Sequence, residues 1–316
     1  MSTTVQPAPT RTIAKRKSAL RRRNTLMGWT FILPNFVGFA LLTLIPIAAL
    51  IFISFTKWGA LGDPVFVGLK NYRTMFTQGT YWTALWNTVY YTIIHMPLTL
   101  VISLALALLL NQKMRGVAFF RTAAFFPYIT SIVAIAVVWN LLFSPEYGPI
   151  DQMLSWLGVS AENLPRWTTG ASPITGAMPA VIIVATWREM GYYMLLFLAG
   201  LQTIPPELYE AARMDGANSW QRFWNVTWPG LRPTTFFVTV MLTIGSFKVF
   251  DLILVMTEGG PGQATLVLSQ LIYRTAIGTS GAGGDFGFSS AVAVSLFLIC
   301  LTITIIQFLV NRRAEK

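Results

Sequence analysis

Four ionisable side chains interrupt otherwise apolar stretches of this sequence. Arg188 and Glu189 are adjacent in one stretch, and Lys248 and Asp251 lie three residues apart in another, a spacing that predicts one shared helix face. A charge near the centre of a bilayer costs roughly 2.5–3.5 kcal/mol, so each should face a bundle interior or water. Because their charges cancel, these residues could form ion pairs that lock helices together, or a hydrated, neutral cavity that hydrogen-bonds hydroxyl groups.

Other residue types that could do chemistry are sparse. His95 is the single histidine, and we expect an interior hydrogen-bonded group rather than a proton relay, because no acidic residue neighbours it in the sequence. The single cysteine, Cys300, is expected to be a small buried hydrophobe. The sequence has no CxxC, HExxH or P-loop pattern, which predicts no metal site, cofactor or nucleotide site in this chain. A membrane enzyme would need a richer constellation than one histidine.

The elements that position these residues must be membrane helices. Of the 316 residues, 54% are hydrophobic and 11% are charged, whereas a soluble domain carries roughly 25% charge. A helix needs about 20 apolar residues to cross a bilayer, and six stretches qualify. The stretches are residues 28–54, 84–110, 118–143, 178–201, 234–256 and 289–310. The predicted fold class is an all-α membrane protein with six transmembrane helices.

Charge distribution predicts the orientation. Basic residues gather in residues 1–27, in the connections after the second and fourth stretches, and in residues 312–316. The positive-inside rule places these segments, and so both termini, in the cytoplasm. Residues 1–27 are expected to be a disordered basic tail before a retained first helix, and residues 28–311 the six-helix domain. This pattern explains the net charge of +11 without a nucleic-acid partner.

The predicted cytoplasmic loop at residues 205–233 contains helix signals. Pro206 suits a first helical turn, Gly216 a helix stop, and Ser219 the N-cap of a second helix that Trp228-Pro229 would end. The loop could rest on the bilayer as an amphipathic segment. Its length and its acidic residues instead favour a surface that docks a partner protein, since membrane-surface helices are more often basic.

This loop resembles the EAA loop of ABC importer permeases, which supplies the coupling helix that enters a cleft of the ATPase subunit. The segment EAARMDGANSWQRFWNVTWPGLRP carries the likeness, with Trp228-Pro229 where the family usually has Leu-Pro. FVGLKNY, FFRTAAFFPYITSIVAIAVVWNLLFSPEYG, GSFKVFDLILVMTEGGPG and FGFSSAVAVSLFL are similar to the carbohydrate-uptake branch, the A- or F-type maltose, lactose and glycerol-3-phosphate permeases. The resemblance implies the type I importer fold. It implies these ATPase-coupling residues: Glu207, Glu210, Ala211, Ala212, Asp215, Gly216 and Ala217.

The same resemblance implies a substrate site halfway across the membrane. Its residues would be Tyr128, Ser131, Arg188, Glu189, Gly245, Ser246 and Val249, with Lys248 and Asp251 adjacent. Charged residues stand here where the maltose-type relative has neutral ones, so the substrate should differ. The neutral charge sum of the predicted cavity disfavours an anion.

The implied function is a permease subunit in the bacterial inner membrane that takes up a mono- or oligosaccharide by alternating access. The implied partners are a second homologous permease, an ATPase dimer that holds ATP and Mg²⁺, and an extracytoplasmic sugar-binding protein. A permease for a sugar phosphate of the glycerol-3-phosphate type is an alternative. An ion-coupled secondary transporter is another, but it predicts inverted repeats and broken helices at corresponding positions, which the sequence does not show clearly.

Overall fold

The computed structural model describes residues 27–59, 62–112, 115–144, 148–160, 164–170, 176–278 and 283–314. The predicted basic tail, apart from Met27, and the last two residues of the predicted C-terminal segment lie outside them. The chain divides into two units, Met1–Phe52 and Ile53–Lys316. The elements are η1 (Ala40–Leu44), α2 (Ile45–Ser54), β1 (Thr56–Lys57), β2 (Val65–Phe66), α3 (Lys70–Thr77), α4 (Gly79–Leu110), α5 (Val117–Ile129), α6 (Ile132–Leu142), α7 (Pro149–Trp156), α8 (Ala177–Gln202), α9 (Pro206–Met214), α10 (Ser219–Arg222), η3 (Phe223–Thr227), α11 (Trp228–Gly230), α12 (Arg232–Phe247), α13 (Asp251–Met256), α14 (Leu268–Ile277) and α15 (Phe286–Ala314).

The first unit is described only from residue 27, and there it is helical. The helix Met27–Ser54 contains the π-helical turn η1 and continues as α2. Pro46 explains that turn, because proline has no N–H to give to the carbonyl of Leu42. The helix compensates with a wider hydrogen bond from the Ile45 N–H to the Ala40 oxygen. Proline therefore widens this helix without ending it.

The apolar stretches form helices, but two of them are interrupted. Among the described residues, four helices are long and apolar enough to cross a membrane: Met27–Ser54, α4, α8 and α15. In the third stretch, α5 and α6 meet at a bend of 97°. In the fifth, α12 ends at Phe247 and α13 begins at Asp251. The expectation of continuous helices over residues 118–143 and 234–256 is therefore wrong.

Helices of the second unit pack closely around α8. α4 and α5 both lie against it, and α12 packs on α4. A Cβ added to Gly191 of α8 would lie 1.9 Å from the Ala124 carbonyl oxygen, so only glycine allows α5 this near. Polar bonds add to the packing, including one of 2.9 Å from the Ser103 hydroxyl to the Met190 oxygen. Close packing and interhelical hydrogen bonds hold membrane helices together, because lipid tails are as apolar as the side chains and the hydrophobic effect does not drive the helices to associate.

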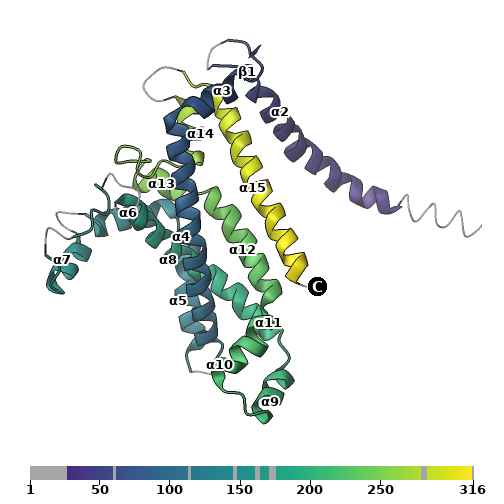
Figure 1. The fold of residues 1–316 in the computed structure, drawn as a ribbon, viewed down its shortest axis with the longest axis vertical. Helices are drawn as coiled ribbons and strands as arrows, with labels where there is room; N and C mark the ends of the chain where they lie inside the picture. The colour runs from purple at the N-terminus through teal and green to yellow at the C-terminus, as the bar shows by residue number, and fades with distance from the viewer. Residues whose placement is uncertain are drawn as a thin grey trace, which may run out of the picture. The chain divides into compact units, whose positions relative to one another are not determined.

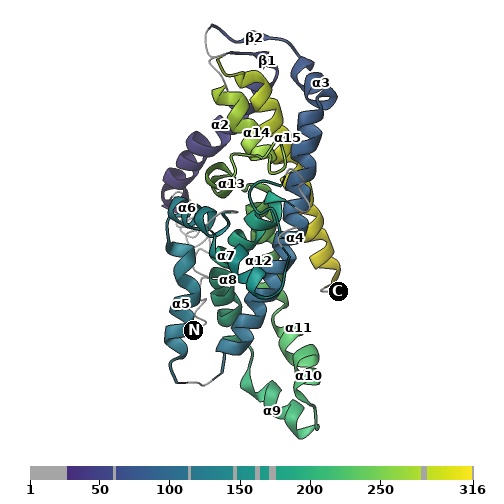
Figure 2. The same ribbon diagram turned by 90° about the vertical axis from the view of Figure 1, so that its left-hand side faces the viewer.

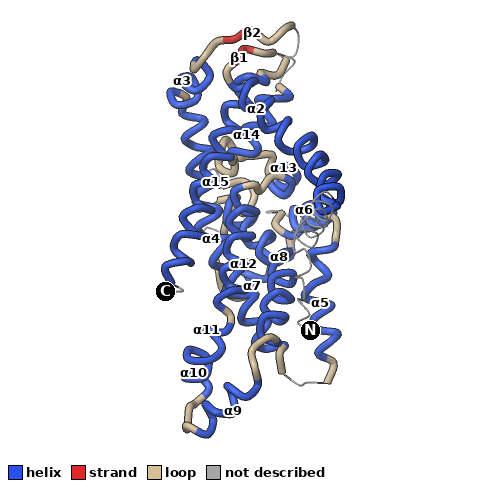
Figure 3. Tube along the Cα trace, turned by 90° about the vertical axis from the view of Figure 1, so that its right-hand side faces the viewer, coloured by secondary structure: helices blue, strands red, loops and turns tan. Residues whose placement is uncertain are grey.

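The two ends of the second unit differ (Figures 1 and 3). At one end β1 and β2 form a short antiparallel pair next to α3 and the start of α15. At the other end, α9 and α10 extend past the ends of α4, α8 and α12. These two elements are the helices expected within residues 205–233.

Candidate functional site

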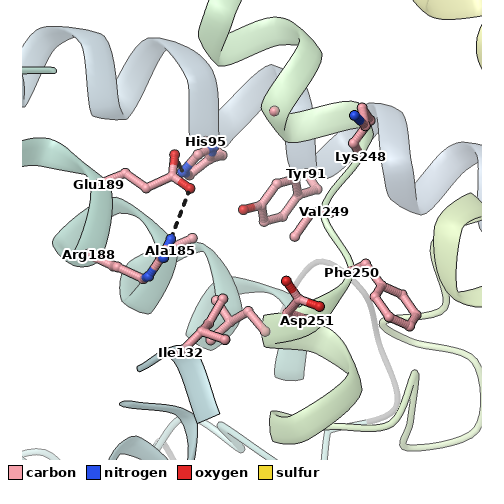
Figure 4. Close-up of a pocket in the computed structure, with 12 residues that line it drawn as sticks. Tyr91, His95, Ile132, Ala185, Arg188, Glu189, Lys248, Val249, Phe250 and Asp251 are labelled. Carbon is pink, nitrogen blue, oxygen red and sulfur yellow. Dashed lines mark ion pairs between the residues drawn. The ribbon is translucent and has the colours of Figure 1, made fainter. Parts of the chain in front are cut away.

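A cavity of about 200 Å³ lies beside the middle of α4 and α8, where α12 breaks before α13. All four charged residues singled out from the sequence line it, as do Gly245 and Val249. The wall is completed by Tyr91, His95, Ile132, Ala185, Phe250 and Leu252. The prediction that the charges gather in one place is therefore confirmed (Figure 4).

A chain of polar contacts crosses this cavity from α8 to α4 and α12. Arg188 Nη1 lies 3.7 Å from Glu189 Oε1, and Glu189 Oε2 lies 3.8 Å from His95 Nε2. On its other side, His95 Nδ1 is 2.9 Å from the Ser246 hydroxyl. The expectation of an interior hydrogen-bonded histidine is confirmed. Its acidic neighbour, Glu189, is on another helix and therefore invisible in the local sequence.

The polar groups of this chain retain hydrogen-bonding capacity. Both separations from Glu189 are longer than a hydrogen bond, so its carboxylate can still accept hydrogen bonds. The buried atoms Arg188 Nε and His95 Nε2 have no hydrogen-bond partner among the described residues. Buried polar atoms are rarely left unpaired, so unpaired ones beside a cavity indicate a polar ligand or water there.

Aromatic rings fix the positions of the two central side chains. Tyr91 stacks on His95 at 4.9 Å between ring centroids, one helical turn away on α4. The guanidinium carbon of Arg188 lies 5.3 Å from the ring centre of Tyr128, which stacks in turn on Tyr192 at 4.5 Å. A cation over an aromatic face is held by the ring quadrupole. Tyr128 thus contacts Arg188, although it does not line the cavity.

Lys248 and Asp251 do not share a helix face, contrary to the expectation from their spacing. Lys248 caps α12 through its backbone N–H, 3.2 Å from the Ile244 oxygen, and Asp251 opens α13. Helix dipoles favour a cation after one helix end and an acid at the start of the next. Both side chains are exposed, and neither forms an ion pair within the described residues. They are available to water or a ligand.

The remaining predicted site residues fall into different positions. Ser246 reaches the site through its bond to His95, whereas Ser131 is exposed at the α5–α6 bend and does not line the cavity. Tyr91 and Phe250 were not predicted. Tyr91 could have been found, because it lies four residues before His95 and so on the same helix face. Whether any of these residues touches a substrate stays a prediction.

The predicted coupling loop has a well-defined helix end at Gly216. Its φ of 77° is left-handed, and the Ala217 N–H bonds the Ala212 oxygen at 2.9 Å. The Gly216 N–H bonds the Arg213 oxygen at 3.1 Å. This pair of bonds is the Schellman motif, which favours glycine at the left-handed position. The expectation of a helix stop at Gly216 is confirmed.

Two local expectations for this loop are wrong. The N-cap of α10 is Asn218, not Ser219, and Asn218 forms a reciprocal capping box with Gln221. The helix also continues through Trp228-Pro229. The π-helical turn η3 precedes Pro229, and the Trp228 N–H bonds the Phe223 oxygen, which again compensates for a missing proline N–H.

The first helix of the loop, α9, presents an exposed tip beyond the long helices (Figure 2). Glu207, Glu210, Ala211, Asp215 and Gly216 are exposed, and Ala212 and Ala217 are half-buried. Two apolar side chains accompany them: Leu208 is 51% exposed and Met214 is 88% exposed. Tyr209 holds α9 against η3 through a 3.1 Å contact between its hydroxyl and that of Thr227. That this supported, exposed helix docks a partner protein stays a prediction.

Comparisons with known proteins agree with this architecture. Residues 100–316 match the family described as binding-protein-dependent transport system inner membrane component. The chain is 32% identical to the probable starch degradation products transport system permease protein AmyD of Thermoanaerobacterium thermosulfurigenes, over 95% of this chain and 98% of the relative. It is 33% identical to the trehalose/maltose transport system permease protein MalF of Thermococcus litoralis, over 93% and 97%.

A solved structure has the same fold. It is a bacterial alginate ABC transporter in complex with an alginate pentasaccharide-bound periplasmic protein, matched with a TM-score of 0.77 at 24% identity over 93% of this chain and 96% of that chain. This likeness confirms the predicted all-α importer permease fold. The chain belongs to the family of binding-protein-dependent transport system inner membrane components.

Proposed function

We propose that this chain is the permease subunit of an ATP-driven importer that takes up an uncharged sugar delivered by an extracytoplasmic binding protein. The observation that carries the proposal is the cavity beside the middle of α4 and α8, with two cations and two acids on its wall. The names of AmyD and MalF support sugar as the substrate class.

The chemistry of the cavity suits a polyhydroxylated molecule. Glu189 can accept hydrogen bonds from hydroxyl groups, and Arg188 and Lys248 can donate to sugar oxygens. Tyr91 lines the cavity beside these groups, with its ring buried against His95. Since the charges of the wall cancel, a bound anion would meet no net attraction. A sugar without phosphate therefore fits better than a sugar phosphate.

The source of energy lies outside this chain in our proposal. The tip of α9 would enter a cleft of an ATPase subunit, where ATP and Mg²⁺ bind, and would carry its closure to the membrane helices. A second permease would complete the pathway, and the binding protein would dock on the outer loops, including residues 144–177 and 257–288. This arrangement places α9 and both termini in the cytoplasm.

Reconstitution tests this function directly. The purified complex is sealed in proteoliposomes with the binding protein on one side and ATP on the other, and uptake of a panel of labelled sugars is measured. We expect uptake of a neutral sugar that needs ATP and survives collapse of proton and sodium gradients. Uptake driven by an ion gradient without ATP would refute the proposal. Preferential uptake of a sugar phosphate would refute its substrate class.

A further inference from the structure

A second cavity, of about 430 Å³, opens between α12 and α15 at the end of the second unit that carries α9 and α10. α12 contributes residues at helical spacing: Arg232, Thr235, Phe236 and Thr239. α15 contributes Ile306, Gln307, Val310 and Asn311. The two stripes run antiparallel, because α12 begins where α15 ends. The groove they form is separate from the site already described.

The mouth of this groove is polar and positively charged. Arg232 is exposed at the first position of α12, and Trp228 lies beside it. Within the wall, the buried atoms Thr235 Oγ1 and Gln307 Oε1 have no hydrogen-bond partner among the described residues. Gln307 is oriented by its other end, since its Nε2 donates to the Thr243 hydroxyl at 2.8 Å. One hydroxyl, one amide oxygen and one guanidinium therefore belong to side chains that line the same groove.

The inner part of the groove is apolar. Phe236 is half-buried and packs edge-on against Phe308 at 5.0 Å, while Ile306 and Val310 are 53% and 61% exposed. From Arg232 to Thr239 the groove follows α12 for about 10 Å into the membrane. A charged mouth at the membrane surface above an apolar slot matches the two parts of a phospholipid. Basic pockets between membrane helices bind anionic headgroups in this way.

We propose that the groove between α12 and α15 binds one anionic phospholipid. Its phosphate accepts hydrogen bonds from Arg232 and from the Thr235 hydroxyl, a headgroup or glycerol hydroxyl donates to Gln307 Oε1, and an acyl chain lies along Phe236 and Val310. The site is in the inner leaflet, an assignment that rests on the orientation given with the proposed function. Lipid binding itself does not depend on which substrate the transporter carries.

Native mass spectrometry of the whole purified complex tests the headgroup contact. The complex is titrated with phosphatidylglycerol or with phosphatidylcholine of the same acyl chains. We expect wild type to prefer phosphatidylglycerol, and Arg232→Gln to lose about five-fold of that preference. The matched control is Arg115→Gln, an exposed arginine in the connection between α4 and α5, which should behave as wild type. An equal preference in wild type and Arg232→Gln would overturn the proposal.

Photo-crosslinking identifies what occupies the apolar part. p-Benzoylphenylalanine is introduced at Val310, and the complex is irradiated in phosphatidylglycerol vesicles. We expect a lipid adduct, which Thr239→Trp should reduce by filling the slot. An adduct to another subunit, or to a different part of this chain, would show that protein covers the groove and would overturn the proposal. Because sugar uptake is not measured, failure here is distinguishable from failure of the proposed function.

Discussion

At the scale of single residues, Glu189 is the centre of the cavity. It lies between two nitrogen-bearing side chains, the Arg188 guanidinium on its own helix and the His95 imidazole on α4, and neither is close enough for a hydrogen bond. A tightly bonded pair would have locked α4 to α8 and left no capacity for a ligand. The ion pair between Arg188 and Glu189 lies within α8, so it does not lock two helices together, and it borders an open cavity.

Removal of the charge of Arg188 or of Glu189 should impair transport while the complex still assembles. Arg188→Ala and Glu189→Ala each remove a charged hydrogen-bonding group, worth roughly 1.5–3 kcal/mol, so uptake should fall about ten-fold or more. Uptake by reconstituted complexes is the measurement, with Arg115→Ala as the control. If the variants instead fail to assemble with their partner subunits, these two side chains serve the structure of the complex rather than transport.

At the scale of elements, close packing of α5 on α8 depends on one missing methyl group. Gly191→Ala would place a Cβ 1.9 Å from the Ala124 oxygen and 2.5 Å from its carbonyl carbon, and backbone atoms cannot rotate away. We expect a loss of stability of about 1–3 kcal/mol. Thermal unfolding of the solubilised complex measures it. Gly245→Ala is the control, because nothing lies within 4 Å of its added Cβ; equal melting temperatures would contradict the packing argument.

The end of α9 gives a second prediction for an element. Gly216 has a φ of 77°, whereas proline is fixed near −65°, so Gly216→Pro must rearrange the tip. ATP-dependent uptake should be lost while membrane insertion is kept, as judged by uptake assays and by membrane fractionation. Gly216→Asn should retain most activity, since asparagine tolerates the left-handed region. Normal uptake by the proline variant would refute the coupling role of this tip.

At the scale of the whole molecule, the proposed assembly can be tested by purification. Affinity purification of the tagged full chain from its native membrane should recover a P-loop ATPase and a second permease. Mass spectrometry of the eluate identifies both. The same preparation after Leu208→Glu and Met214→Glu should contain less ATPase, because each substitution places a charge at an exposed apolar position of α9. An ATPase absent from the wild-type eluate would contradict the proposed assembly.

The apolar stretches predicted the helices of this fold, because length and hydropathy are local properties. The interruptions could not be predicted in the same way. α12 ends at Phe247, in a stretch that is apolar apart from Lys248 and Asp251. The α5–α6 bend lies at Thr130 and Ser131, one turn after Pro127, which α5 accommodates. Pro46 and Pro229 are residues that usually end a helix, yet both lie within helices that continue. Tertiary packing decides these cases.

For the cavity, the sequence predicted which charged residues lie together, but not which residues of other helices they contact. Arg188, Glu189, Lys248 and Asp251 were identifiable because charge is rare in an apolar stretch. The contact of His95 with Glu189 was not, because the two residues are on different helices. Tyr91 was not predicted, although its position four residues before His95 puts it on the same helix face, where it stacks on His95.

The continuity of α8 has a mechanical consequence. Its 26 residues form an unbroken rod of about 39 Å, and only Thr203, Ile204 and Pro205 separate it from α9. Glu189 lies near the middle of the rod. A tilt of roughly 10° about that point would move Gln202 by about 3 Å. A push on the end of α8 next to α9 would therefore also turn the Glu189 carboxylate at the middle of the helix.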